Sequence, residues 1–143
     1  MTKSIFVNLP VADVAAATAF YQAIGFEKND MFSNERGSAM VWSDAITVMV
    51  LDHAFFATFT DKRIIDARTH TGALFALGFD SREAVDAITE AALAAGGREL
   101  HDPEDEGYMY SRAFEDLDGN GWGPFSMDMA AAPQAPAEMQ PAS

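Results

Sequence analysis

Histidine is the residue type in this sequence best suited to acid–base or metal chemistry, and there are three: His53, His70 and His101. Cysteine is absent, which removes disulfide bonds, thiolate metal ligands and a cysteine nucleophile. No histidine stands in a His-x-x-x-His pair or beside a glutamate, and all three fall between predicted elements. We therefore interpret them as loop histidines. A role in a pocket stays open for His53 and His101, which lie near the ends of predicted strands.

A second set of polar groups lies on one of the last predicted strands, where Tyr108, Tyr110 and Arg112 alternate. Side chains at every second position of a strand share a face. This stripe could therefore hydrogen-bond a ligand oxygen and pair with a ligand carboxylate. The alternative is a surface salt bridge from Arg112 to Glu115 or Asp116, which is the commoner fate of an arginine in an acidic chain.

Composition limits the possible partners. The chain has 143 residues, of which 49% are hydrophobic, and this suits one domain with a substantial core. Nine Lys plus Arg against 22 Asp plus Glu give a formal net charge of −13, which repels phosphate groups. We therefore expect neither a nucleic-acid nor a membrane partner. No apolar run is long enough for a secretory signal or a membrane span, so we expect a cytoplasmic location.

The first third of the chain predicts the order strand, helix, strand, strand. Residues 4–9 alternate with a period of two, and Pro10 is expected to end this strand because proline has no N–H to donate. Asp13 is a suitable N-cap for a helix that stops at Gly25. Two further strand-like runs follow, at 38–42 and 46–51.

The second half repeats this order. An apolar run at 73–79 precedes Asp80, the expected N-cap of a second helix, and Glu83 follows three residues later as in a capping box. Two strands come after that helix, at 108–115 and 122–127. The repetition indicates a duplicated module.

Two segments lie outside the repeat. Residues 52–71 carry several Phe and Ile among charges, which predicts a short helix plus a loop. Its Phe residues could close over a ligand cup as a lid, cover a sheet edge, or pack onto the core as a simple connection. The end of the chain, 130–143, is rich in Ala, Pro and Gln and predicts a mobile tail.

Three stretches of sequence carry a resemblance to a known superfamily: FVNLPVAD with AFYQAIGFE, GFDSREAVDAITEAALAAGGRE, and GYMYSRAFEDLDGNGWGPF. They resemble the vicinal oxygen chelate superfamily, which includes glyoxalase I, bleomycin-resistance proteins and extradiol dioxygenases, and more narrowly its glyoxalase-like subgroup. The resemblance implies an α+β fold in which two βαβββ modules of one chain form a curved-sheet cup. It implies one domain over 1–129, with module one at about 3–51, a connection at 52–71 and module two at about 72–129.

The resemblance also implies where a metal ion would be bound. In the superfamily's enzymes, four inward side chains hold a divalent ion, usually His or Gln, Glu, His and Glu. The equivalent positions here are Phe6, Met49, Leu74 and Gly123. None of the four provides the imidazole or carboxylate donor that such an ion requires. We therefore expect no metal ion and no cofactor.

Alternation along the strands predicts which side chains line the cup. They are mostly Phe, Met, Leu and Gly, so the cup should favour an apolar or aromatic ligand. The alternative is that these side chains fill the cup and simply form core. The predicted ligand-binding residues are Phe6, Asn8, Met49, Leu74, Tyr108, Tyr110, Arg112, Gly123 and Phe125.

Three functions follow as hypotheses. The first is metal-free binding of a small apolar or aromatic molecule, by sequestration as in bleomycin-resistance proteins. The alternative is a glyoxalase-like lyase or isomerase, or a dioxygenase, whose metal site or acid–base group is not recognisable from sequence. The third is an interaction module with a vestigial cup. The resemblance further implies a homodimer.

Overall fold

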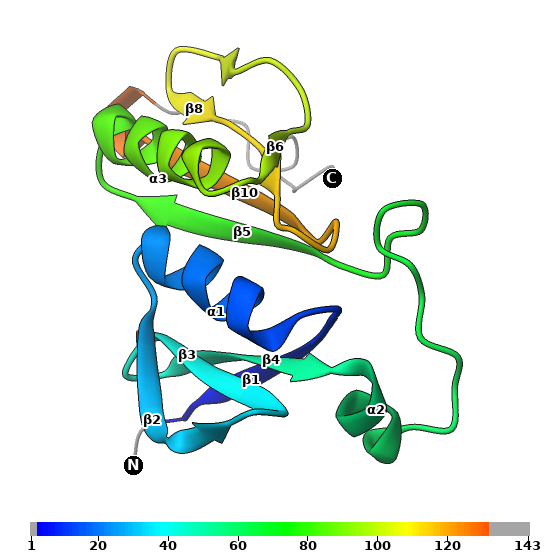
Figure 1. The fold of residues 1–143 in the computed structure, drawn as a ribbon. Helices are drawn as coiled ribbons and strands as arrows, with labels where there is room; N and C mark the ends of the chain where they lie inside the picture. The colour runs from blue at the N-terminus through cyan, green and yellow to red at the C-terminus, as the bar shows by residue number, and fades with distance from the viewer. Residues whose placement is uncertain (1–2, 132–143) are drawn as a thin grey trace.

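The computed structural model describes residues 3–131 and contains two sheets, each with one long helix (Figure 1). The N-terminal sheet pairs its strands in the order β1-β4-β3-β2, and only the β1–β4 pair is parallel. Its elements are β1 (Ile5–Val11), α1 (Val14–Ala23), β2 (Glu27–Asn34), β3 (Gly37–Ser43) and β4 (Ile46–Asp52).

The C-terminal sheet repeats this arrangement. β10 pairs in parallel with β5 on one side and antiparallel with β8 and β9 on the other, while β7 and β6 lie outside these two. Its elements are β5 (Leu74–Phe79), α3 (Arg82–Ala94), β6 (Arg98–Glu99), β7 (Glu104–Asp105), β8 (Met109–Ser111), β9 (Phe114–Glu115) and β10 (Gly121–Met127). The outer two strands of the module are each interrupted, but the order is that of the first sheet. The expected α+β fold with two βαβββ modules is confirmed.

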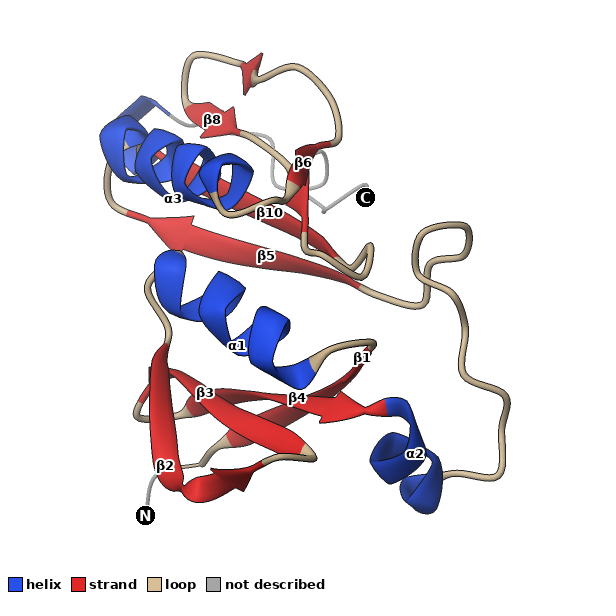
Figure 2. Cartoon of the chain, viewed as in Figure 1, coloured by secondary structure: helices blue, strands red, loops and turns tan. Residues whose placement is uncertain are grey.

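A long segment joins the two modules, and we call residues 53–73 the connector (Figure 2). It begins with α2 (His53–Phe56) and the short 3-10 helix η1 (Ala57–Phe59), then runs without regular structure to β5. Asp52 caps α2 by accepting a hydrogen bond from the Phe55 backbone N–H at 2.7 Å. The chain closes with the 3-10 turn η2 (Met129–Ala131), and the rest of the predicted tail, 132–143, lies outside the described residues.

Helix starts follow local side-chain chemistry. Asp13 caps α1 as expected, since its carboxylate accepts from the Ala16 backbone N–H at 3.0 Å. The expected Asp80 cap of α3 is wrong. Ser81 caps that helix instead, its hydroxyl accepting from the Ala84 backbone N–H at 3.1 Å. The cap therefore lies one residue later than the capping-box pattern with Glu83 suggests.

Two strand predictions need correction. Pro10 does not end β1, which continues to Val11, because β1 is an outer strand whose free side tolerates a residue without an N–H. The strand β2 is present in the structure but was not predicted from the sequence. Its sequence, EKNDMFSN, has no clean alternation, and its side chains are mostly exposed at the edge of the sheet.

One core joins both modules. Residues from the helix-facing sides of the two sheets pack with residues of α1 and α3 in a single buried cluster. Aromatic side chains cross between the modules, with ring centroids of Tyr21 and Trp122 5.8 Å apart and those of Trp42 and Phe79 5.9 Å apart. Figure 1 shows α1 lying between the N-terminal sheet and β5. Within residues 3–131, none of the helices has the length and apolar character needed to cross a membrane.

Candidate functional site

Strand registers establish which positions of the two modules are equivalent. Asn8 pairs with Met49 across the parallel β1–β4 ladder, and Ala76 pairs with Gly123 across the parallel β5–β10 ladder. The matching ladders also make Phe6 the counterpart of Leu74. The four positions that the superfamily's enzymes use for metal therefore lie on equivalent strands, yet they carry Phe, Met, Leu and Gly. Among the described residues, no group of three or more His, Cys, Asp or Glu side chains could hold a metal ion.

Each sheet has one face covered by a helix and one face that we call its open face. On the open faces, Phe6 is 61% exposed and Leu74 is 71% exposed, whereas Leu9 and Leu77 on the covered faces are buried. The covered faces meet in the shared core, so the open faces are turned away from it. The open-face positions of β1, β4, β5 and β10 are Phe6, Asn8, Pro10, Thr47, Met49, Leu51, Leu74, Ala76, Gly78, Gly121, Gly123, Phe125 and Met127.

Along β1, β4, β5 and β10 the open faces carry no charged side chain, and their large side chains are Phe, Met and Leu. The flanking strands add carboxylates to the same faces: Glu27, Glu104 and Glu115. Gly78 and Phe125 sit directly opposite each other, so the ring of Phe125 lies over the backbone of β5, 3.3 Å from where a Gly78 side chain would begin. Glycine at this position thus makes room for the ring on the open face.

The polar stripe of β8 lies on the other side of its sheet. Tyr110 pairs with Ser126, not with Phe125, so it faces α3 together with Arg112. Its hydroxyl donates to Asp86 of α3 at 2.6 Å. Tyr110 and Arg112 were predicted to bind ligand in the same set as Phe125, but the register of β8 on β10 turns them toward α3, on the side of the sheet opposite Phe125. Tyr108 lies beside Tyr110 in a shallow depression near the start of α3.

Arg112 is a buried structural cation. Only 8% of it is exposed, and its guanidinium contacts three carboxylates: Asp86 at 3.1 Å, Glu90 at 2.8 Å and Glu99 at 3.0 Å. Burial disfavours the charge, but the hydrogen bonds outweigh burial and raise the pKa of Arg112. The Tyr110 hydroxyl and Arg112 together lower the pKa of Asp86.

The alternative prediction, a surface salt bridge from Arg112 to Glu115 or Asp116, is also wrong. Glu115 pairs instead with Arg98 at 3.1 Å, and Asp116 is buried and accepts from Tyr21. Arg112 therefore joins α3 to the C-terminal sheet from the buried side, with partners that lie 13 to 26 positions earlier in the chain.

The three histidines occupy different places. His53 and His70 belong to the connector and line a cavity that it encloses. His101 is exposed, and its Nδ1 lies 2.8 Å from the Asp102 carbonyl oxygen. Of the predicted ligand-binding residues, Asn8 also lines that cavity. Sequence reasoning missed the other polar groups there, among them Lys62, Arg63 and Arg68. The available signal was the gathering of three of the nine Lys and Arg residues within seven positions of an acidic chain.

The fold defines the class of protein. Solved structures that match include a hypothetical protein from S. aureus (24% identity, 88% of this chain and 94% of that chain, TM-score 0.74). A glyoxalase/bleomycin resistance protein/dioxygenase family enzyme from Burkholderia phytofirmans PsJN also matches (22%, 85% and 96%, TM-score 0.69). So does the fosfomycin resistance protein FosX from Listeria monocytogenes (21%, 88% and 93%, TM-score 0.62). The chain has the fold of the vicinal oxygen chelate superfamily, as its sequence resemblance implies.

A family model narrows the relationship. Residues 3–41 match the family described as bleomycin resistance protein-like N-terminal, which covers β1, α1, β2 and most of β3. No curated protein matches the chain. The matched N-terminal segment is similar to bleomycin-resistance proteins, and the fold as a whole is similar to that of glyoxalase/bleomycin-resistance structures.

Proposed function

We propose that this protein binds a small apolar or aromatic molecule on its open sheet faces, without a metal ion. The supporting observation is the pair of large exposed side chains at equivalent positions, Phe6 and Leu74. A protein surface rarely leaves neighbouring large apolar side chains exposed without a ligand or partner to cover them. Flat aromatic and flexible Met side chains suit an apolar ligand of unspecified shape.

The same observation favours a homodimer. The two open faces of one chain are turned away from their shared core, so neither covers the other. A second copy would place the open N-terminal face of one protomer against the open C-terminal face of its partner and enclose a ligand between them. Burying Phe6 and Leu74 in this way would stabilise the dimer through the hydrophobic effect.

The alternative is an enzyme of the lyase, isomerase or dioxygenase type. Metal-dependent chemistry would need donors that Phe6, Leu74 and Gly123 lack. A metal-free acid–base reaction would need a basic group beside the apolar side chains, where β1, β4, β5 and β10 offer only Asn8 and Thr47. The open-face carboxylates Glu27, Glu104 and Glu115 stand on the flanking strands instead, and Glu115 is paired with Arg98. We therefore favour binding without turnover.

The test uses 2-naphthalenemethanol, a neutral aromatic probe, measured by calorimetry with sedimentation in parallel. We expect saturable binding by a dimer, and we expect Phe6→Ser to weaken it about tenfold because the ring contact is lost. Met31→Ser is the matched control, since Met31 is 84% exposed on β2, the edge strand farthest from β1 in its sheet. A monomer that binds the probe equally well in all three forms would contradict the proposal.

Metal dependence is tested on the same protein. Incubation with Ni²⁺, Zn²⁺, Mn²⁺ and Fe²⁺ should leave no stoichiometric metal on the protein and should not change the affinity for the probe. Stoichiometric metal, or loss of binding on chelation, would favour the enzyme alternative.

A further inference from the structure

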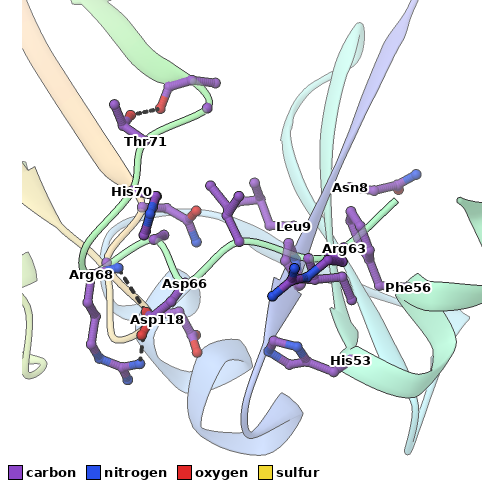
Figure 3. Close-up of a pocket in the computed structure, with 18 of the residues that line it drawn as sticks. Asn8, Leu9, His53, Phe56, Arg63, Asp66, Arg68, His70, Thr71 and Asp118 are labelled. Carbon is purple, nitrogen blue, oxygen red and sulfur yellow. Dashed lines mark hydrogen bonds and ion pairs between the residues drawn. The ribbon is translucent and has the colours of Figure 1, made fainter. Parts of the chain in front are cut away.

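A cavity of about 670 Å³ lies between the connector and the two modules (Figure 3). Its walls are the connector, the end of β1 with the residue that follows it, and the turn that precedes β10. This volume falls in the range of small-molecule sites, about 300–1,000 Å³. We propose that it is a binding site for an organic carboxylate with an apolar body; it borders the open faces at Asn8, Pro10 and Gly121 but does not include Phe6 or Leu74.

The cavity has apolar walls that a ligand could cover. Phe59 is 61% exposed and Ile65 is 45% exposed, and both line the cavity together with the buried Leu9 of β1. Phe56 and Phe75 add two more rings. An apolar ligand body would remove this surface from water, which is the main driving force for binding in such sites.

The charge in the cavity wall is opposite to the charge of the chain. Lys62, Arg63 and Arg68 line it, three of the nine Lys and Arg residues of a protein whose net charge is −13. His53 and His70 add ring nitrogens, of which at least one per ring is an N–H donor. Such a local concentration of donors attracts an anion.

The carboxylates of the wall are already engaged. Asp118 accepts from the Ala12 backbone N–H at 2.9 Å. Asp66 accepts from the Arg68 backbone N–H at 3.0 Å and lies 3.7 Å from the Arg68 guanidinium, which also donates to the Leu117 carbonyl at 3.0 Å. These contacts hold the connector and the turn in place.

Two cations have no such partner. Among the described residues, no carboxylate lies within ion-pair distance, 4.0 Å, of Lys62 or Arg63. Figure 3 shows Arg63 on the same side of the cavity as His53 and Phe56, while Arg68, His70 and Asp118 lie at the other end. A planar guanidinium next to a ring suits a carboxylate attached to an apolar group, because Arg can bind both carboxylate oxygens at once.

The net charge restricts the ligand further. A polyanion would be repelled by the acidic surface around this small basic site, whereas a single carboxylate would experience less repulsion. The structure therefore favours a monocarboxylate with an aromatic or branched apolar body over a phosphate-rich ligand.

The experiment compares 2-naphthoate with 2-naphthalenemethanol, which has the same rings and no charge. We expect 2-naphthoate to bind more tightly, and Arg63→Gln to weaken its binding about tenfold while leaving the alcohol unaffected. Lys28→Gln is the matched control: it removes the same charge from β2, where Lys28 pairs with Asp30 on the surface. Backbone amide shifts of residues 66–70 should move with 2-naphthoate.

The outcomes separate this cavity from a site at Phe6 and Leu74. Phe6→Ser should leave 2-naphthoate binding intact even though it weakens the neutral probe. Equal affinities for the two probes, or 2-naphthoate binding that is lost in Phe6→Ser and unchanged in Arg63→Gln, would overturn the proposal. Thermal unfolding of each variant checks that the fold is retained, and Lys62→Gln provides a second variant if Arg63→Gln fails to fold.

Discussion

The Tyr21 hydroxyl of α1 donates a hydrogen bond of 2.5 Å to the carboxylate of Asp116, which lies 95 positions later in the chain. The Trp122 indole N–H in turn donates to the Tyr21 oxygen at 3.1 Å. The same carboxylate accepts from the backbone N–H groups of Asp118 and Asn120. One buried hydroxyl therefore links the helix of the first module to the last turn of the second.

Removing this hydroxyl should weaken the contact between the modules. In Tyr21→Phe, the buried Trp122 N–H loses its partner and Asp116 loses one of its donors, so we expect unfolding free energy to fall by about 2 kcal/mol. Urea unfolding measures the change. Tyr108→Phe is the control and should be near neutral, because the Tyr108 hydroxyl makes no hydrogen bond within residues 3–131. Equal effects of the two substitutions would contradict the structural role of Tyr21.

Alkaline pH should act through the same residue. Burial, then the nearby charge of Asp116, raise the pKa of Tyr21 well above its ordinary value. The folded protein keeps this proton while an unfolded chain loses it near pH ~10, so stability is complete below that pH and falls as the pH rises above it. Urea midpoints at increasing pH should show this slope.

Substitutions can show which residue causes the fall of the urea midpoint at alkaline pH. Tyr21→Phe should reduce this fall, whereas Tyr110→Phe should reduce it less. The pKa of Tyr110 is also raised, by its bond to Asp86, but that side chain is less buried. A slope that is unchanged in Tyr21→Phe would show that other groups control alkaline unfolding.

Gly119 brings the last turn against the connector. Its φ is +97°, and a Cβ there would lie 2.6 Å from the Arg68 nitrogen and 2.7 Å from the Ala67 carbonyl carbon. Gly107, with φ +84°, has open space around the same position. Each Ala substitution should lower the free energy of unfolding by about 1 kcal/mol, because alanine disfavours the left-handed backbone conformation. Gly119→Ala should lower it by roughly 2 kcal/mol more, because the backbone of the connector must move to make room for the Cβ.

The pair of variants also tests the cavity wall. Gly119→Ala should weaken 2-naphthoate binding because the connector must shift, and Gly107→Ala should not. Equal stabilities of the two variants in urea would show that the connector does not pack against the turn.

Arg112 holds three carboxylates around one cation. Arg112→Met keeps an unbranched apolar stem but removes the guanidinium, which leaves Asp86, Glu90 and Glu99 close together without a counter-charge. Removing one partner of a buried ion pair is strongly destabilising. Because these carboxylates are partly exposed, we expect the free energy of unfolding to fall by only about 2 kcal/mol. Arg112→Lys should lose less, because it keeps the charge and only part of the hydrogen bonding.

A surface arginine provides the comparison. Arg82→Met removes a paired but exposed contact with Asp105 and should have a smaller effect than Arg112→Met. Urea unfolding of the three variants gives the order. Arg112→Met as mild as Arg82→Met would contradict the structural role of Arg112.

The sequence predicts the modular fold because its signals are local. The Asp13 cap and the alternation in β1 each depend on a few neighbouring residues. The edge strand β2 escapes this reasoning, since exposed strands do not need an apolar side. Ser81 in place of Asp80 is the same kind of error, because two adjacent residues can each cap a helix.

The site was less predictable because it depends on register and on distant segments. The parity of Tyr110 and Arg112 is visible in the sequence, but the face they occupy is set by the pairing of Tyr110 with Ser126. The cavity near Arg63 depends on how the connector packs against β1 and the last turn, residues 50 or more positions away. No local pattern encodes that contact.

The separation of the sheets has a consequence for folding order. Every strand pairs only within its own module, so each sheet can close without the other. The bonds from Tyr21 to Asp116 and from Ala12 to Asp118 instead span 95 and 106 positions. Contacts between residues so far apart in the chain tend to form late in folding, because closing a long loop is entropically costly until local structure has formed. Tyr21→Phe should therefore speed unfolding and leave the refolding rate nearly unchanged.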